Sequence, residues 1–103
     1  MDIGNAIREL RKDKMKSQGE IAAMAGISSS SLSQIEKGHK RPTEKTLNAI
    51  ASALGVPSAL IYLLGIEEAD VPENKKEVYS SLFPTAKELL IQMLKSDQSQ
   101  DVN

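Results

Sequence analysis

Short hydrogen-bonding side chains are concentrated between Ser28 and Lys37, where the sequence runs SSSSLSQIEK. If this stretch is helical, Leu32 and Ile35 point to one side, since residues three apart share a helix face. The other side then carries Ser29, Ser30, Ser33, Gln34 and Lys37. Such a face is poorly suited to a core, and its hydroxyls, amide and cation suit base edges and phosphates. The alternative interpretation is a solvated polar face with no further role.

The sequence offers little for catalysis or for metal binding. It contains no Cys, and His39 is its single histidine. No pair of carboxylates stands in an evident pocket-forming segment, so a nucleophile with its base, or a set of metal ligands, is hard to assemble. We therefore predict that the protein is not an enzyme and that it holds neither a metal nor a cofactor.

Two short helices joined at a glycine must position the polar face. Ser17 and Glu20 have the spacing of a capping box, which predicts a helix start. Gly26 is placed to end that helix, because glycine adopts the left-handed conformation without a Cβ clash. Ser28 can cap the next helix, and Gly38 can end it. The pattern predicts a helix-turn-helix over residues 17–38.

Further helices are predicted on both sides of this pair. Ile3, Ile7 and Leu10 recur at helical spacing and predict a helix over residues 3–14. Pro42 and Thr43 signal the start of a fourth helix. Its apolar positions are Leu47, Ile50, Ala51 and Leu54, and a fifth, short helix is predicted over 58–64. Residues 1–65 are therefore expected to form one all-α domain.

The remaining residues, 66–103, are expected to form an acidic linker and an amphipathic helical tail. Pro72 makes a continuous helix across residues 66–74 improbable. Beyond it, residues 73–82 can form a helix, and Pro84 is expected to separate it from a last helix that starts at a capping box of Thr85 and Glu88. That helix would carry an apolar face of Ala86, Leu89, Leu90, Met93 and Leu94, and the polar end from about Ser96 is expected to fray.

Charge is distributed unevenly along the chain. Residues 1–65 hold nine Lys and Arg against six Asp and Glu, whereas residues 66–103 hold four against eight. Positive charge therefore accompanies the helix-turn-helix, as phosphate binding requires, although the whole chain has a net charge of −1. The longest apolar run, 59–64, is too short to span a bilayer, and the N-terminus has no signal segment. We expect a cytoplasmic protein without a membrane partner.

Many of these positions together resemble a known family. The order and spacing of the key residues are similar to those of the Cro/CI-type (XRE-like) helix-turn-helix family over residues 3–64. The matching positions are Gln18, Ala22, Gly26, Leu32, Ile35, Glu36, Gly38, Pro42, Leu47 and the run from Leu54 to Val56. The resemblance implies a five-helix, lambda-repressor-like DNA-binding domain, followed here by a short helical C-terminal extension. The second helix would cross the phosphate backbone of double-stranded DNA, and the third would lie in the major groove.

Roles for individual residues follow from this resemblance. Ser29, Ser30 and Gln34 would face base edges. Contacts to phosphates would come from Gln18, Ser28, Ser31, Lys37, Lys40 and Arg41. Arg11 and Glu36 would form a structural ion pair that holds the first helix to the end of the third. For the basic loop 37–41, solubilising charge is the alternative role.

The leading hypothesis is a sequence-specific transcriptional regulator, a repressor that binds operator DNA as a homodimer. The alternative is an antitoxin-type interaction module, in which residues 73–95 bind a protein partner and the helix-turn-helix regulates the shared operon. The apolar pattern of the tail leaves open whether it dimerises, docks on its own chain or binds a partner.

Overall fold

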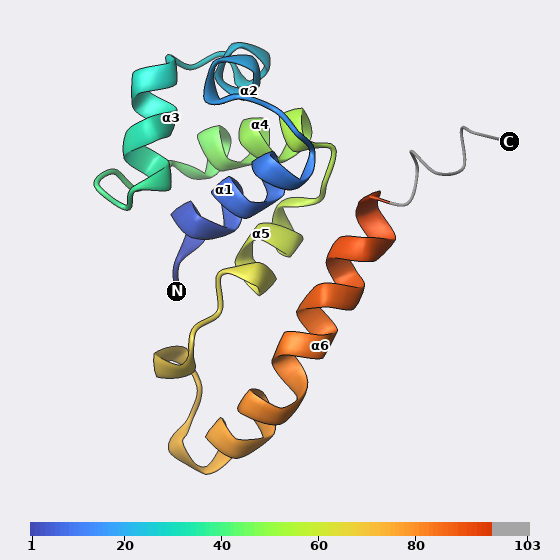
Figure 1. Ribbon diagram of the computed structural model, residues 1–103. Helices are drawn as coiled ribbons and strands as arrows, with labels where there is room; N and C mark the ends of the chain where they lie inside the picture. Colours follow the sequence, from blue (N-terminus) through green and yellow to red (C-terminus); the bar gives the residue numbers. More distant parts are fainter. Residues whose placement is uncertain (96–103) are drawn as a thin grey trace, which may run out of the picture. The chain divides into compact units, whose positions relative to one another are not determined.

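The computed structural model describes residues 1–95, and all regular structure in that range is helical (Figure 1). The chain folds into two compact units. The first comprises Met1–Ile66, and the second begins at Glu67. The first unit contains five α-helices, which confirms the predicted all-α fold. They are α1 (Ile3–Asp13), α2 (Gln18–Ala25), α3 (Ser29–Glu36), α4 (Glu44–Leu54) and α5 (Ser58–Leu64).

Polar caps fix the starts of the helices that hold the polar face. Ser17 Oγ accepts from the backbone N–H of Glu20 at 3.1 Å, and Glu20 Oε1 accepts from the N–H of Ser17 at 2.9 Å, so the predicted capping box is present. Ser28 Oγ caps α3 by accepting from the N–H of Ser31 at 3.0 Å. Thr43 likewise caps α4. These bonds satisfy N–H groups that have no partner within the first turn of a helix.

The turn between α2 and α3 depends on Gly26, which has a φ of 74°. Its N–H donates to Ala23 O, and the N–H of the next residue donates to Ala22 O at 3.0 Å, which is a Schellman motif. The chain ends α1 with the same two bonds, but Met15 occupies the left-handed position there, at a φ of 58°. Its side chain is 85% exposed. A residue with a Cβ is strained in the left-handed conformation, so the backbone at Met15 stores some strain.

One apolar core holds the five helices of the first unit together. In Figure 1, α2 lies beside α3 and α4, and α1 lies beside α3 and α5, in agreement with their packing contacts. Every one of the five helices contributes a fully buried residue. The largest of these are Ile7, Ile21, Leu32, Ile35, Ile50 and Ile61. The exposed polar face of α3 is therefore the outer side of a helix whose inner side is fixed in the core.

Gly4 allows the start of α1 to lie directly against the end of α3. A Cβ built on Gly4 would stand 2.7 Å from the carbonyl oxygen of Glu36 and would also meet that of Ile35. Both obstacles are backbone atoms, so they cannot move aside as a flexible side chain can. Only glycine fits this contact without a shift of one helix.

In the second unit, the prediction that Pro84 ends a helix is wrong. One continuous helix, α6, runs from Lys76 to Lys95 and contains Pro84, so Thr85 and Glu88 do not start a helix. Proline removes one N–H from the helical ladder, but the segments on both sides keep a common apolar side, which favours one helix over two. Just before Pro84, the rings of Tyr79 and Phe83 stack with centroids 4.9 Å apart.

The acidic segment before α6 is more ordered than a plain linker. It contains two short 3₁₀ turns, Glu68–Asp70 and Glu73–Lys75. Lys76 Nζ donates to the carbonyl oxygens of Glu68 at 2.7 Å and Val71 at 3.1 Å, which ties the segment to the start of α6. The predicted frayed end from Ser96 lies outside the described residues.

The apolar residues of α6 differ in how far they are exposed to solvent. Leu90 and Leu94 are half-buried, whereas Leu89 and Met93, predicted on the same face, are largely exposed. Within residues 1–95, no single helix is long and apolar enough to cross a membrane. α4 and α5 taken together reach that length and apolar content, but they bend by 95° at their junction and most of their apolar residues are buried in the core.

Candidate nucleic-acid interface

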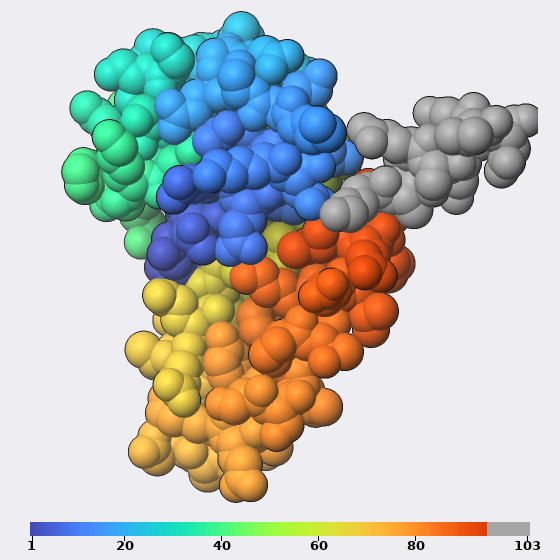
Figure 2. Space-filling view, viewed as in Figure 1, coloured from blue at the N-terminus to red at the C-terminus, as the bar shows by residue number. Residues whose placement is uncertain are grey.

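The outer side of α3 carries the side chains that the sequence assigns to base edges. Ser29, Ser30 and Gln34 are all exposed, while Leu32 and Ile35 on the same helix are buried. Figure 2 shows the atoms of α2 and α3, light blue to green, adjoining those of α1, in darker blue, at the surface of the first unit. The three side chains are therefore accessible on one side of a fixed helix.

The basic loop after α3 folds back onto that helix. Gly38 has a φ of 80°, and the N–H groups of His39 and Lys40 both reach Gln34 O, at 2.9 and 3.3 Å. This fold brings Lys40 Nζ to 3.1 Å from Ser31 Oγ. Lys37 and Arg41 are also exposed, so the structure places three cations beside the end of α3 and leaves their charges open to solvent.

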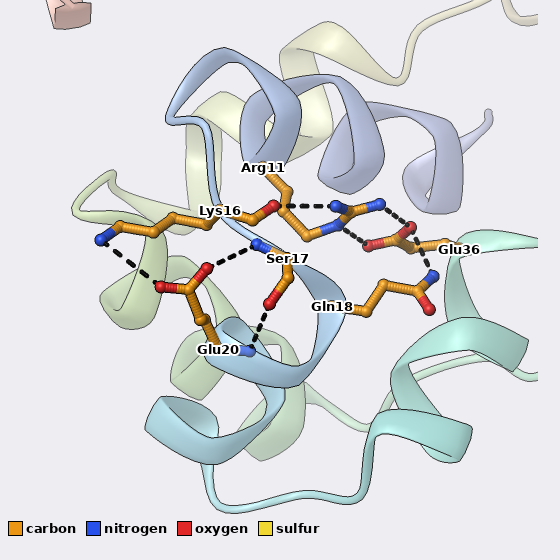
Figure 3. A network of polar contacts seen from close by, with 6 residues as sticks. All are labelled: Arg11, Lys16, Ser17, Gln18, Glu20 and Glu36. Atoms are coloured by element: carbon orange, nitrogen blue, oxygen red, sulfur yellow. Dashed lines mark hydrogen bonds and ion pairs between the residues drawn. The ribbon is translucent and has the colours of Figure 1, made fainter.

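A network centred on Arg11 joins three elements (Figure 3). Its Nε and Nη2 atoms donate to the two carboxylate oxygens of Glu36, at 2.7 and 2.9 Å. Its Nη1 atom donates to the carbonyl oxygen of Lys16 at 2.9 Å. Both partners of the ion pair are buried, with side chains 10% and 2% exposed. The two-pronged geometry fixes orientation as well as distance, so it aligns α3 relative to α1 and to the corner before α2.

Gln18, predicted to contact a phosphate, belongs to the same network. Its Nε2 atom donates to Glu36 Oε1 at 3.0 Å (Figure 3). An amide nitrogen has two hydrogens, so the second can still be donated to an anion. Gln18 is also the first residue of α2, where backbone N–H groups carry the positive end of the helix dipole.

The network keeps Glu36 ionised. Burial alone would raise the pKa of Glu36, but hydrogen bonds from Arg11 and Gln18 and the charges of Arg11 and Arg8 outweigh it, so the pKa lies below its ordinary value. The hydrogen bond to Glu36 in turn raises the pKa of Arg11. The pair is therefore charged at neutral pH, and none of the buried side-chain polar atoms in the described part of the chain lacks a partner.

Two cations near this network were missed from the sequence. Arg8 and Lys12 on α1 line a surface pocket with Arg11, Gln18, Glu36 and Lys37. The spacing of Arg8 and Lys12, one helical turn apart and flanking Arg11, is the signal that could have indicated them. No group of three or more His, Cys, Asp or Glu residues able to hold a metal ion occurs within residues 1–95.

Comparison with known proteins identifies the family. The family model described as helix-turn-helix matches residues 7–61, more than half of the chain. The chain belongs to the XRE-type helix-turn-helix family. The family is one of DNA-binding transcriptional regulators, and residues 7–61 of this chain carry its helix-turn-helix.

Named helix-turn-helix relatives agree with this membership. The chain is 35% identical over 80 residues to the immunity repressor protein of Bacillus phage phi105, an alignment that covers 78% of this chain and 54% of the repressor. It is 41% identical over 54 residues to the HTH-type transcriptional regulator y4dJ of Sinorhizobium fredii, which covers 52% of this chain and 70% of that one. This helix-turn-helix chain thus spans about half the length of the phage repressor.

A solved structure shares the fold of the helix-turn-helix domain. The clp gene regulator ClgR from Corynebacterium glutamicum matches with a TM-score of 0.61 at 30% identity. The match covers 62% of this chain and 83% of the ClgR chain. The predicted lambda-repressor-like fold class is confirmed by this likeness and by the five helices.

Proposed function

We propose that this helix-turn-helix protein is a sequence-specific repressor that binds operator DNA as a homodimer, with α3 in the major groove. The observation that carries the proposal is the exposed polar side of α3, which is aligned by a buried, two-pronged ion pair between Arg11 and Glu36. A recognition helix must be held in a fixed orientation, because small misplacements lose hydrogen bonds to base edges. The cytoplasm is the compartment in which such a protein meets its DNA.

We assign different roles to the two groups of side chains. Gln34 can donate to and accept from one adenine through its amide, so it supplies most of the base discrimination. Ser29 and Ser30 can each donate or accept, and they discriminate less. Gln18, Ser28, Ser31, Lys37, Lys40 and Arg41 are proposed to contact phosphates, which position the helix without reading sequence.

The homodimer is proposed to form through α6. Val78, Leu82, Leu89 and Met93 are between 54% and 71% exposed. Their spacing of four, seven and four residues places them on one side of the helix. A 20-residue helix is roughly 30 Å long, which gives two copies a long line of contact. A dimer would set two copies of α3 on half-sites about 34 Å apart.

The same exposed side of α6 also supports the antitoxin-type alternative, in which a protein partner covers it. The two functions differ in the state of the purified chain. A repressor dimerises by itself at the concentration at which it binds DNA, whereas an antitoxin-type module needs the product of a neighbouring gene to cover α6. The mass of the free protein in solution distinguishes them.

Selection of bound sequences from random duplexes tests the proposed function. The expected winner contains two inverted half-sites whose centres lie one helical turn apart, because a two-fold symmetric dimer selects a two-fold symmetric site. A winner with a single half-site would contradict the dimer. The absence of any enriched sequence, with equal affinity for all duplexes, would contradict sequence-specific repression.

A further inference from the structure

The pocket beside the Arg11–Glu36 pair carries a large excess of positive charge. Four cations line it, and Glu36 is its single anion. Both oxygens of that carboxylate already accept hydrogen bonds from Arg11, and one of them also accepts from Gln18. Both oxygens of the carboxylate are therefore already held by hydrogen-bond donors from the protein. Three cations remain around it, namely Arg8, Lys12 and Lys37.

None of these three cations is within ion-pair distance of a carboxylate in the described part of the chain, although the charge of Arg8 acts on Glu36. The buried ion pair of the first unit is Arg11 with Glu36, and its exposed lysine pair joins Lys16 to Glu20. Arg8, Lys12 and Lys37 are all exposed and come from two helices, α1 and the end of α3. Cations that converge on one pocket repel one another unless an anion lies between them. The arrangement thus has the chemistry of an anion site.

We propose that a DNA backbone phosphate binds in this pocket, held by Arg8 and Lys12 from α1 together with Lys37. The inference rests on the proposed function, and it adds α1 to the DNA-binding surface, which the helix-turn-helix alone does not include. The second amide hydrogen of Gln18 and the positive end of α2 point to the same occupant. A phosphate here also explains why the exposed side of α1 next to Arg11 is basic.

The position of the pocket favours duplex DNA over a free phosphate ion. Glu36 and Lys37 lie at the end of α3, the helix proposed to enter the major groove, and Gln18 begins the helix proposed to cross the backbone. A helix in the major groove has a phosphate backbone on each side of it. A cation pocket between the start of α2 and the end of α3 therefore faces one of these two backbones. A small ion held by exposed lysines and arginines alone binds weakly, because water competes for every contact.

The double variant Arg8→Gln, Lys12→Gln tests the proposal without disturbing the core, since both side chains are exposed. Lys14→Gln is the matched control, because it removes a cation from the end of the same helix but does not line the pocket. Binding to the selected duplex and to a random duplex is measured over a series of salt concentrations. The double variant is expected to weaken binding to both by the same factor. The slope of log affinity against log salt is expected to fall by about 0.9, the value for one lost phosphate contact.

Neutral methylphosphonates, placed one at a time along the selected duplex, locate the contact. At one position in each half-site the neutral linkage should weaken binding of the parent protein and have little further effect on the double variant. Lys14→Gln should behave like the parent at every position. Unchanged affinity of the double variant would overturn the proposal. So would the absence of any position at which the neutral linkage weakens the parent protein more than the double variant. Either result would leave the proposed function in place.

Two further outcomes distinguish a DNA phosphate from a free phosphate ion as the occupant of the pocket. If the parent protein binds no duplex at all, the proposed function and this inference both fall. Titration with inorganic phosphate, followed through the NMR signal of the Gln18 amide, gives the affinity of the free ion. Saturation at phosphate concentrations below those that weaken DNA binding would assign the pocket to a free ion and overturn its assignment to DNA.

Discussion

The Nε atom of Arg11 lies 2.7 Å from Oε2 of Glu36, although 25 residues separate them in sequence. This contact fastens α1 to the end of the helix that we propose reads DNA. Because Arg11 also donates to the carbonyl oxygen of Lys16, one guanidinium group holds the corner before α2 as well. A charged pair in the interior thus aligns the exposed side of α3 relative to α1 and α2.

Removal of Arg11 should cost a large share of the stability of the first unit. Arg11→Met leaves Glu36 buried with only the Gln18 amide as a partner, and such a change costs about 3–5 kcal/mol. Small domains have a free energy of unfolding of about 5–15 kcal/mol, so the variant should unfold at a clearly lower urea concentration than the parent. Urea unfolding followed by circular dichroism measures the loss.

The double variant Arg11→Met, Glu36→Leu is the control for this prediction. It removes both charges, so no unpaired carboxylate is buried, and it should regain most of the lost stability. Its DNA affinity should nevertheless stay reduced, because apolar contacts do not fix the orientation of α3 as two parallel hydrogen bonds do. A double variant that is as unstable as Arg11→Met would show that the energetic role assigned to the pair is incorrect.

Acid should destabilise the first unit through Glu36. The pKa of Glu36 is lowered in the folded protein, whereas an unfolded glutamate titrates near pH 4.3. Between these two values the unfolded chain binds more protons, so the free energy of unfolding rises with pH. The stabilisation is complete above the unfolded pKa and is lost as the pH falls through the folded one. Urea unfolding at a series of pH values below neutrality should show this slope.

Glu36→Gln isolates this contribution, because it keeps the shape and removes the titrating group. The pKa of Glu20 is also lowered, through hydrogen bonds from the backbone and side chain of Ser17, so some pH dependence will remain. The variant should therefore have a shallower slope than the parent, though not a flat one. Equal slopes in the two proteins would rule out Glu36 as the main acid-sensitive group.

Two glycines on helices should respond to alanine in opposite directions. Gly4→Ala places a Cβ against the backbone of α3 and should destabilise the protein by about 1–3 kcal/mol or more. Gly19→Ala meets only Ser17 Oγ, at 3.8 Å, and should stabilise α2 by up to about 1 kcal/mol. Urea midpoints of the two variants measure both effects. If Gly4→Ala were neutral, α1 would not lie as close to α3 as the structure places it.

A charge on the exposed side of α6 should separate the proposed dimer. Leu82→Glu or Leu89→Glu would bury a carboxylate between two helices, which costs several kcal/mol when no cation pairs with it. The dissociation constant of the dimer should rise by about 30-fold or more, the effect of a strong interface residue. Sedimentation equilibrium measures it. Ser80→Glu adds the same charge on the other side of the helix and should leave the dimer intact, whereas a parent protein that is already monomeric would favour the antitoxin-type alternative.

Local signals predicted most of the first unit. Ser17, Ser28 and Thr43 each start a helix because their side chains satisfy backbone N–H groups within three residues, and this depends only on nearby sequence. Gly26 ends α2 for an equally local reason. The role of Gly4 could not be predicted in this way, because it depends on a carbonyl oxygen from α3, more than thirty residues later.

The errors concern features that depend on context beyond a single turn. Pro84 carries a strong local signal to end a helix, yet α6 continues through it. The pocket around Arg8 and Lys12 is visible only when α1 and the end of α3 are side by side. The resemblance to the XRE-like family supplied the Arg11 and Glu36 pair, which spacing alone would not have paired.

The central claim is that α3 reads bases, and Gln34→Ala tests it against Lys40→Ala. Loss of the Gln34 amide should cost about 1–3 kcal/mol on the selected duplex and relax one base position, with little effect on random DNA. Loss of Lys40 should weaken binding to all sequences and lower the salt slope by about one.

The most direct measurement is the ratio of affinities for the selected and the random duplex, determined for the parent and for Gln34→Ala at one salt concentration. The ratio should fall by about 5- to 150-fold in the variant, which corresponds to that free-energy range. An unchanged ratio, with equal losses on both duplexes, would contradict the claim that the exposed side of α3 reads DNA sequence.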